Sequence, residues 1–387
     1  MSNTVPSLLE MIHQLVATPS VSCTLDDWDM SNRPVIDLLA NWLNELGFEV
    51  EVLPVPGYAG KYNLIATLGS GSGGLILSGH TDTVPYNAEK WQSDPFKITE
   101  RNDKLYGLGT CDMKAFFALA IEASRAYLQT PLKAPLILLA TADEESSMSG
   151  AQALATAGKP KARYAVIGEP TGLKPIRMHK GIMMEGIKVT GKAGHSSNPA
   201  LGVNAMEGMH RVLGELIQYR GELQNRYQNA SFAVSVPTLN LGCIHGGDNP
   251  NRICGQCELE YDLRPLPGMD MDALREDIQA RMKPIASELG VDIECGPIFT
   301  GVPSFETPAE AELVQTAERL TGHPSQAVAF ATEAPFLSGM GIETLVMGPG
   351  SIDQAHQPDE YLALDQIKPT VELLSQLIER YCVNALA

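Results

Sequence analysis

Short apolar runs alternate with helically spaced apolar residues in the N-terminal part of the chain. Apolar residues recur every three or four positions, as in amphipathic helices, at 8–16, 35–46 and 116–128. Runs rich in aliphatic residues and bounded by Gly, Pro and Ser predict strands at 48–55, 63–68, 75–79, 136–141 and 164–167. This alternation predicts an α/β domain with a mixed, largely parallel sheet, helices on both faces, and ligands at the carboxyl ends of the strands.

After Gly181 the order of elements changes. The pattern predicts a strand, a helix, two strands, a helix and a strand at 184–190, 204–219, 238–244, 253–264, 271–288 and 291–298. This β-α-β-β-α-β order is typical of a ferredoxin-like α+β domain. Further elements at 309–321, 343–347 and 366–381 have the lengths needed to complete the first domain. We therefore expect a discontinuous first domain, 1–181 and 293–387, with a second domain, 182–292, inserted into it.

Length, composition and charge narrow the class of protein. A chain of 387 residues exceeds the usual size of one core, which agrees with two domains. The net charge of −18 opposes nonspecific binding to nucleic acid or anionic membranes, and no apolar run is long enough to span a membrane. Residues 1–10 lack the pattern of a secretory signal, and the seven scattered cysteines are typical of reduced thiols. We therefore expect a cytoplasmic protein without nucleic-acid or membrane partners.

Two local motifs resemble a dinucleotide-binding loop and a cysteine metal site, but the surrounding sequence argues against both functions. The glycine-rich segment 69–74 has the spacing of a dinucleotide-binding loop, but it leads into a strand rather than a helix, so we interpret it as a hairpin turn. Cys254 and Cys257 have the spacing of metal-binding cysteines, yet no second pair accompanies them and they lie in an alternating strand. The sequence also contains no G-x-S-x-G elbow, which counts against a serine hydrolase.

Acidic and imidazole side chains follow the strands of the first domain. His80 ends the strand at 75–79, and Asp82, two residues on, is suited to accept the second ring proton of a metal-binding imidazole. Other candidates stand in a glycine-rich turn or after later strands: Asp112, Glu144, Glu145, Glu169 and His356. Because the carboxyl ends of parallel strands meet at one edge of a sheet, we expect these groups to converge.

Two histidines, a bridging aspartate and two further carboxylates are a sufficient ligand set for two divalent ions. These ligand types favour Zn²⁺, with Co²⁺ or Mn²⁺ as alternatives. Glu144 and Glu145 are adjacent, so we expect one of them to bind metal. The other would act as general base beside a water molecule whose pKa the ions lower.

The motifs resemble those of the M20 metallopeptidase family, which includes aminoacylases, glutamate carboxypeptidases and desuccinylases. The resemblance spans the chain and is greatest to bacterial deacetylases of an N-acetylated amino acid. It is carried by residues 79–85 (GHTDTVP), 105–110 (LYGLGT), 251–254 (NRIC), 264–269 (RPLPGM), 332–336 (TEAPF) and 355–360 (AHQPDE). It implies a two-zinc enzyme that hydrolyses a small N-acyl amino acid.

The resemblance also implies a role for each candidate. His80 and Glu169 would hold one ion, Glu145 and His356 the other, and Asp112 would bridge them. Glu144 would be the general base, Asp82 would orient His80, and the peptide bond between Asp112 and Met113 would be cis. The inserted domain would act as a lid and join two chains in a homodimer, with His195 stabilising the oxyanion in the partner's site. Asn251 and Arg264 would hold the substrate's carboxylate.

Glu333 has two interpretations that the sequence leaves open. It precedes Pro335 at a predicted helix start, where an acidic residue gains about 0.3 to 1 kcal/mol from the helix dipole. Alternatively, it is the counter-charge for a cationic amine on the substrate's side chain.

The activity also has alternatives. An enzyme with the same metal centre could be a succinyl-diaminopimelate desuccinylase or a broad aminoacylase. The chain could also be a noncatalytic metal or metabolite binder, although a binder would not need a base such as Glu144.

Overall fold

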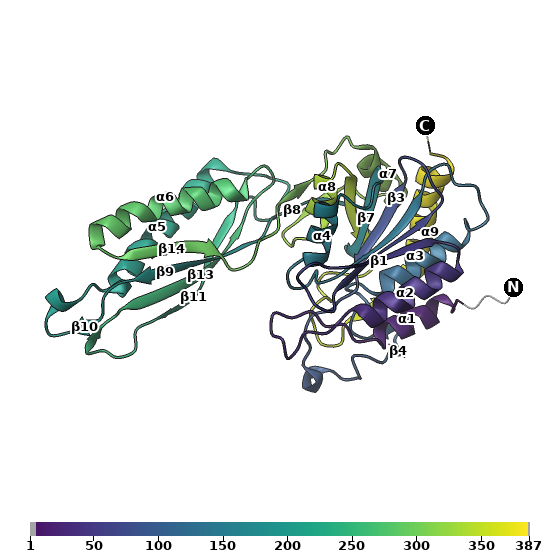
Figure 1. Ribbon diagram of the computed structural model, residues 1–387. Coiled ribbons are helices and arrows are strands. Elements are labelled where there is room, and N and C mark those ends of the chain that lie inside the picture. Colours follow the sequence, from purple (N-terminus) through teal and green to yellow (C-terminus); the bar gives the residue numbers. More distant parts are fainter. Residues whose placement is uncertain (1–4, 386–387) are drawn as a thin grey trace. The chain divides into compact units, whose positions relative to one another are not determined.

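The computed structural model describes residues 5–385. The prediction about a secretory signal concerned residues 1–10, and residues 1–4 of that segment lie outside the described residues. The chain divides into two compact units (Figure 1). Unit 2 comprises Met178–Glu306 and Ala327–Ala331, and unit 1 comprises the rest of the described chain. In the described residues, no helix is both long and apolar enough to cross a membrane.

Unit 1 is built on a mixed β-sheet. Its strands are β1 (Glu49–Pro54), β2 (Tyr62–Leu68), β6 (Leu136–Thr141), β3 (Leu75–His80), β7 (Tyr164–Pro170) and β17 (Glu343–Gly348), in spatial order. Beyond β17 the path continues through the short strands β8 (Ile176–His179) and β15 (Phe305–Glu306), while β16 (Gln326–Val328) pairs with β8 off this path; these three strands include residues of unit 2. The central strands β6, β3, β7 and β17 are parallel, and the outer pairs are antiparallel. β3, β6 and β7 are buried along their whole length, as is typical of parallel strands covered on both faces.

Helices cover both faces of this sheet (Figure 1). Leu75 and Leu77 of β3 join one core with residues of α1 (Leu8–Val16), α2 (Arg33–Glu45), α3 (Ala115–Arg125), α7 (Glu312–Thr321) and α9 (Ile367–Ile378). Ile76 points to the opposite face and is also buried. On that face α4 (Ser149–Ala157) packs against α8 (Ala334–Gly339), which contacts β17. The predicted fold class of the first domain is confirmed.

The glycine-rich segment 69–74 is not a hairpin turn, contrary to the prediction. It joins β2 to β3, but β6 lies between these two strands and pairs with both. The local sequence correctly indicated a turn between two strands. It could not indicate that β6, more than sixty residues later in the chain, would lie between β2 and β3 in the sheet.

A small three-stranded sheet also belongs to unit 1. It consists of β4 (Thr99–Arg101), β5 (Lys104–Tyr106) and β18 (Tyr361–Ala363), with β5 in the centre. The pairing of β5 with β18 fixes the segment after His356 beside the segment before Asp112.

Single-turn segments occur at Ala88–Lys90, Pro199–Leu201 and Leu364–Gln366, and a π-helical turn at Glu379–Val383 follows α9.

Unit 2 has the predicted β-α-β-β-α-β order. Its elements are β9 (Met183–Thr190), α5 (Ala205–Arg226), β11 (Thr238–Gly246), β13 (Gln256–Arg264), α6 (Met271–Leu289) and β14 (Asp292–Pro297), with a small pair formed by β10 (Gly194–His195) and β12 (Arg252–Ile253). The main sheet has the antiparallel order β11-β13-β9-β14, and apolar residues of both helices share its core. The side chains of Asn204 and Asp270 cap the N-termini of the two helices.

The predicted boundaries of the inserted domain, 182–292, are narrower than unit 2. Unit 2 continues through β14 because that strand pairs with β9 along its whole length. Cys254 and Cys257 are buried in the core of this unit.

Candidate metal centre

The carboxyl ends of the central strands bring the predicted ligands together. His80 is paired in register with Thr141 of β6, so the segment after His80 lies beside Glu144 and Glu145. Glu169 lies within β7, whose parallel neighbours are β3 and β17. The parallel pairing of these strands therefore brings together acidic and imidazole side chains that are far apart in the sequence, as expected.

His80 is buried, and its two ring nitrogens have different partners. Nδ1 lies 2.9 Å from the backbone carbonyl of Asp82, which can only accept, so Nδ1 carries the proton. Nε2 lies 3.0 Å from Oδ1 of Asp112 and 3.8 Å from Oε1 of Glu169. Burial by itself would lower the pKa of His80, but the hydrogen bond with Asp112 and the charge of Glu169 raise it well above its usual value. Two carboxylates that face Nε2 favour a positive charge there, and a metal ion bound to the Nε2 lone pair would supply it in place of the second ring proton.

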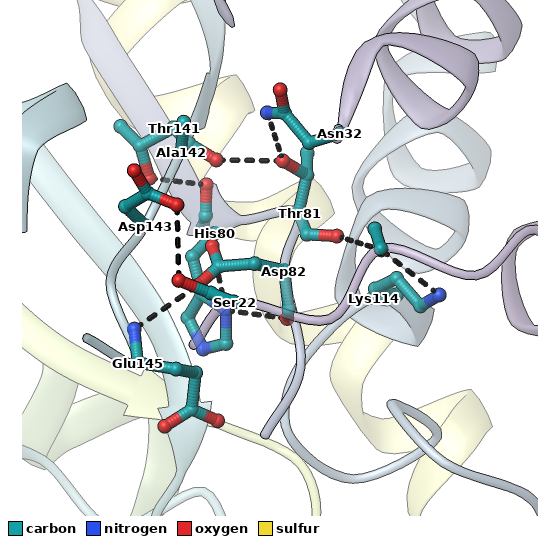
Figure 2. Close-up of polar contacts among 12 residues, drawn as sticks. Ser22, Asn32, His80, Thr81, Asp82, Lys114, Thr141, Ala142, Asp143 and Glu145 are labelled. Carbon is teal, nitrogen blue, oxygen red and sulfur yellow. Dashed lines mark hydrogen bonds and ion pairs between the residues drawn. The ribbon is translucent and has the colours of Figure 1, made fainter. Parts of the chain in front are cut away.

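The carboxylate of Asp82 has a different contact from the one predicted. Its Oδ1 lies 3.7 Å from Nδ1 of His80, while Oδ2 accepts the backbone N–H of Glu145 at 3.0 Å. The main chain of residue 82 thus orients the imidazole, because the carbonyl is closer to the ring than the carboxylate is. The side chain instead holds the segment that carries the two glutamates (Figure 2).

Asp112 faces both histidines with different oxygens. Oδ1 contacts His80 at 3.0 Å, and Oδ2 lies 3.4 Å from Nε2 of His356. Burial would raise the pKa of Asp112, but hydrogen bonds with His356 and His80 outweigh it and hold the pKa well below its usual value. The peptide bond between Asp112 and Met113 is cis, as predicted. The two oxygens of Asp112, each facing a different histidine, are arranged as in a bridging ligand.

His356 also contacts Glu145. Its Nε2 lies 3.0 Å from Oε2 of Glu145, and its half-exposed ring has a pKa raised to about 10 by the hydrogen bonds with Asp112 and Glu145. The backbone of His356 is left-handed, with φ of 60°. Glu145 therefore belongs to the group formed by Asp112 and the two histidines.

Glu144 lies on another side of the same cluster. One carboxylate oxygen of Glu144, one of Glu169 and a ring nitrogen of His80 lie within 4.8 Å of one another, and so do donor atoms of His80, Asp112 and Glu145. The structure thus separates the two adjacent glutamates into different groups. Both groups share His80.

The chemistry of these donors fits divalent cations. Oε1 of Glu169 and Oδ1 of Asp82 are buried and have no hydrogen-bond partner. Burial, followed by the neighbouring negative charges, raises the pKa of Glu144, Glu145 and Glu169. Carboxylates that are buried or partly buried in such proximity are unfavourable unless cations or protons compensate their charge. Hard oxygen and imidazole donors are the ligands expected for Zn²⁺, Co²⁺ or Mn²⁺.

A buried polar network lies next to the cluster, and Figure 2 labels Ser22, Thr81, Thr141 and Asp143 among its members. Asp143, immediately before Glu144, accepts the hydroxyl of Ser22 at 2.9 Å and the amine of Lys61 at 2.7 Å. The hydroxyl of Thr81 donates to the carbonyl of Thr141 at 2.7 Å. Sequence reasoning missed Lys61 and Asp143, because nothing local distinguishes them from surface charges.

Glu360 was also missed from the sequence, although it is the last residue of the motif at 355–360 (AHQPDE). Its buried carboxylate accepts backbone N–H groups of the loop that carries Asp112. Its position in a motif next to His356 was the available signal.

Glu333 is buried beside the cluster, with 1% of its surface exposed. It is the N-cap residue of α8, but its side chain makes no capping hydrogen bond. Oε2 instead accepts the hydroxyl of Thr141 at 2.8 Å, and Oε1 is buried without a partner. Burial raises the pKa of Glu333 to about 7.

The remaining predicted site residues lie in unit 2. His195, in β10, is exposed, and its Nδ1 accepts the backbone N–H of Ser197 at 3.2 Å. A neutral ring therefore carries its proton on Nε2, where it can donate. The carbonyl of Asn251 accepts the N–H of Ser196 at 3.0 Å, so Asn251 lies beside His195.

Arg264 is at the other end of unit 2. It is the last residue of β13, and its Nε donates to Oδ2 of Asp262 at 2.7 Å. Asn251 precedes the first residue of this nine-residue strand, whose eight steps of about 3.3 Å span about 26 Å. A single copy of unit 2 therefore does not bring Asn251 and Arg264 to one carboxylate.

Comparison with known proteins agrees with this geometry. Residues 76–380 match the profile of Peptidase family M20/M25/M40. Acetylornithine deacetylase of Pasteurella multocida (strain Pm70) is 49% identical over 380 residues, which cover 98% of this chain and 99% of that protein. Acetylornithine deacetylase of Klebsiella pneumoniae (strain 342) is 49% identical over 382 residues, covering 99% and 100% of the two chains.

Solved structures show the same fold. Aminopeptidase PepT from Bacillus cereus ATCC 10987 has a TM-score of 0.76 at 22% identity, covering 96% of this chain and 97% of that one. Bacillus subtilis YXEP, described as a dinuclear metal-binding peptidase of the M20 family, has a TM-score of 0.67 at 16% identity, covering 96% and 98%. The chain thus belongs to peptidase family M20/M25/M40 and is a metal-dependent hydrolase, as its motifs predicted.

Proposed function

We propose that this hydrolase removes the acetyl group from N2-acetyl-L-ornithine and releases L-ornithine and acetate. The observation that carries the proposal is the 49% identity to acetylornithine deacetylases over nearly the full chain, joined to a convergent set of metal donors. The reaction would be a step of arginine biosynthesis in the cytoplasm.

The metal centre would hold two divalent ions per chain. His80 and Glu169 would bind one, Glu145 and His356 the other, and Asp112 would bridge them. The two oxygens of Asp112, each facing a different histidine, support this assignment. Zn²⁺ suits the donor set best, with Co²⁺ as an alternative. When bound, the ions would polarise the amide carbonyl and lower the pKa of the attacking water.

Glu144 would move the proton. It belongs to the group with His80 and Glu169 and makes no contact of the kind that joins Glu145 to His356. Its carboxylate would take a proton from the attacking water and then deliver that proton to the departing amine. The carboxylate of Asp82 would keep Glu145 in place by accepting the backbone N–H of Glu145, and the backbone carbonyl of Asp82 would hold the ring of His80.

We further propose a homodimer through unit 2, which would act as a lid. The Nε2 proton of His195 supports a role as donor to the oxyanion. The separation of Asn251 from Arg264 supports recognition of the substrate's carboxylate by residues of two chains, because one copy presents them at opposite ends of β13. His195 and Asn251 lie together and would enter the partner's site as one group.

Glu333 would provide selectivity for a cationic side chain. Its partnerless Oε1 and the absence of a capping bond favour this interpretation over the helix-capping one. The acid would offset the charge of the ornithine side-chain amine as the substrate is desolvated.

A substrate panel tests the proposed activity. Protein reconstituted with zinc or cobalt is assayed for amine release from N-acetylornithine, N-acetylmethionine and N-succinyl-diaminopimelate. We expect the highest kcat/KM with N-acetylornithine. Preference for the succinyl substrate would identify a desuccinylase, similar rates on many N-acyl amino acids a broad aminoacylase, and no turnover of any substrate a noncatalytic binder.

A further inference from the structure

Glu360 joins two segments that carry predicted metal ligands. One carboxylate oxygen, Oε1, lies 3.0 Å from the backbone nitrogen of Gly109, 2.7 Å from that of Cys111 and 3.0 Å from that of Asp112. Each of these N–H groups can only donate, so one oxygen accepts three hydrogen bonds from a single loop. The side chain is 1% exposed, and water therefore does not replace it as the acceptor.

The loop held in this way is tight. Gly109 has a φ of +83°, and a Cβ atom at this position would lie 2.7 Å from Cε of Lys114. Asp112 follows three residues later and precedes α3, so the direction of its carboxylate depends on the conformation of this turn. Three donors that converge on one oxygen specify that conformation more narrowly than a single hydrogen bond does.

The other side of the connection is the segment that carries His356. The backbone carbonyl of Glu360 accepts the N–H of Gly107 at 3.0 Å, and β18 begins with the next residue and pairs with β5. His356 is four positions earlier and is half exposed. The position of Glu360 is therefore fixed from both sides, while the half-exposed ring of His356 contacts the site through Nε2, which faces Asp112 and Glu145.

We propose that Glu360 is a positioning residue that couples the bridging ligand Asp112 to His356. It would hold the backbone of the Asp112 loop in the ligand geometry before any ion binds, and it would not contact the ions itself. Because Glu360 orients the loop rather than donating to the metal, the loss of its acceptor oxygen should matter more than the loss of its charge. This inference rests on the metal centre proposed above.

Two substitutions separate these effects. Glu360→Gln keeps an acceptor oxygen and loses the charge, whereas Glu360→Ala loses both. Zinc stoichiometry and affinity are measured on the full-length protein by competition with a chromophoric chelator, and the coordination geometry is followed by the visible absorption of added Co²⁺. Removal of groups that orient ligands lowers metal affinity about 10- to 100-fold, which we expect for Glu360→Ala. For Glu360→Gln we expect a loss of less than about tenfold, since charged acceptors bind roughly twice as strongly as neutral ones.

Glu343→Ala is the matched control. Glu343 is the first residue of β17, at the opposite end of that strand from the ligands, and its carboxylate accepts the backbone N–H of Leu313 at 2.5 Å. The control should lower the melting temperature and leave zinc affinity within about twofold of wild type. A similar loss of affinity in Glu343→Ala would overturn the inference, because the effect would then be general destabilisation.

The remaining outcomes are also decisive. Equal losses in Glu360→Ala and Glu360→Gln would assign Glu360 to charge alone and overturn its positioning role, as would unchanged affinity in both. If Glu360→Ala fails to fold, Glu360→Leu, which also lacks an acceptor oxygen but fills more of the space, takes its place: a zinc affinity clearly below that of Glu360→Gln, with an altered Co²⁺ spectrum, supports the inference, and an affinity equal to that of Glu360→Gln overturns it. Failure of the wild-type protein to bind two ions would instead refute the proposed metal centre.

Discussion

Replacement of Asp143 by asparagine should destabilise unit 1 markedly. Nζ of Lys61 lies 2.7 Å from Oδ1 of Asp143, and the two side chains expose only 4% and 3% of their surface. Oδ1 also accepts the hydroxyl of Ser22, and Oδ2 accepts that of Ser149 at 3.0 Å. Asparagine preserves the shape and tolerates the left-handed backbone, with φ of 58°, so the substitution mainly removes the charge.

The expected magnitude follows from what remains around Lys61. Loss of one partner of a buried ion pair costs about 3 to 5 kcal/mol. Lys61 keeps Asp29 at 2.6 Å and the carbonyl of Met30 at 2.9 Å, so we expect the lower end, about 3 kcal/mol. At about 2 to 4 °C per kcal/mol for a unit of this size, the melting temperature should fall by roughly 6 to 12 °C.

Calorimetric melting at fixed metal loading measures this shift, and an exposed ion pair provides the control. Lys159 and Glu51 lie 2.8 Å apart with about half of each side chain exposed, so Glu51→Gln should cost at most about 1 kcal/mol. In the double variant Lys61→Met/Asp143→Asn, the two losses should be far from additive, because the buried lysine that Asp143→Asn deprives of one carboxylate partner is absent. A shift for Asp143→Asn no larger than that for Glu51→Gln, or additive losses in the double variant, would refute the reasoning.

Further predictions concern the proposed activity. Glu144→Gln should retain two metal ions per chain and lose about two orders of magnitude or more in kcat, measured with metal analysis on the same sample; near-normal turnover would remove Glu144 from the role of base. Mixing His195→Ala with Glu144→Gln chains should restore activity in heterodimers, whereas no recovery after demonstrated subunit exchange would contradict action across the dimer. Glu333→Gln should lower the ratio of kcat/KM for N-acetylornithine to that for N-acetylmethionine by about tenfold to more than a hundredfold, as expected from a charge-assisted hydrogen bond of about 1.5 to 3 kcal/mol. Equal losses on both substrates would assign Glu333 to structure. Removal of the ions with a chelator should abolish activity and lower the melting temperature, and added Zn²⁺ should restore both.

Several features of the cluster could be predicted because their signals are local. A histidine or an acid directly after a buried strand is visible in the sequence, and the parallel register then requires such groups to meet. His80 and Glu145 were predicted in this way, Asp112 from a glycine-rich turn before a helix, and His356 from the segment a few residues beyond a strand; the structure brings their side chains into contact. The distinction between Glu144 and Glu145 came from family resemblance, since their residue types are identical.

Other features depend on atoms that local patterns do not specify. The sequence placed the carboxylate of Asp82 near His80, but the backbone carbonyl of the same residue is the closer partner, at 2.9 Å against 3.7 Å. From their neighbouring sequence alone, Glu360 and Asp143 look like ordinary acidic residues of loops. Their function follows from partners about 250 and 80 residues away, respectively, which only folding brings within hydrogen-bonding distance.

The sequence by itself determined most of the longer helices and strands, the two-part organisation and the types of metal donor, because hydrophobic periodicity and residue chemistry act over a few neighbouring positions. Tertiary structure decided that β6 enters between β2 and β3, which oxygen faces which ring nitrogen, and which buried acids support the ligands. These outcomes arise from long-range pairing and from the requirement that each buried polar group find a partner, and both conditions are met only when the whole chain has folded.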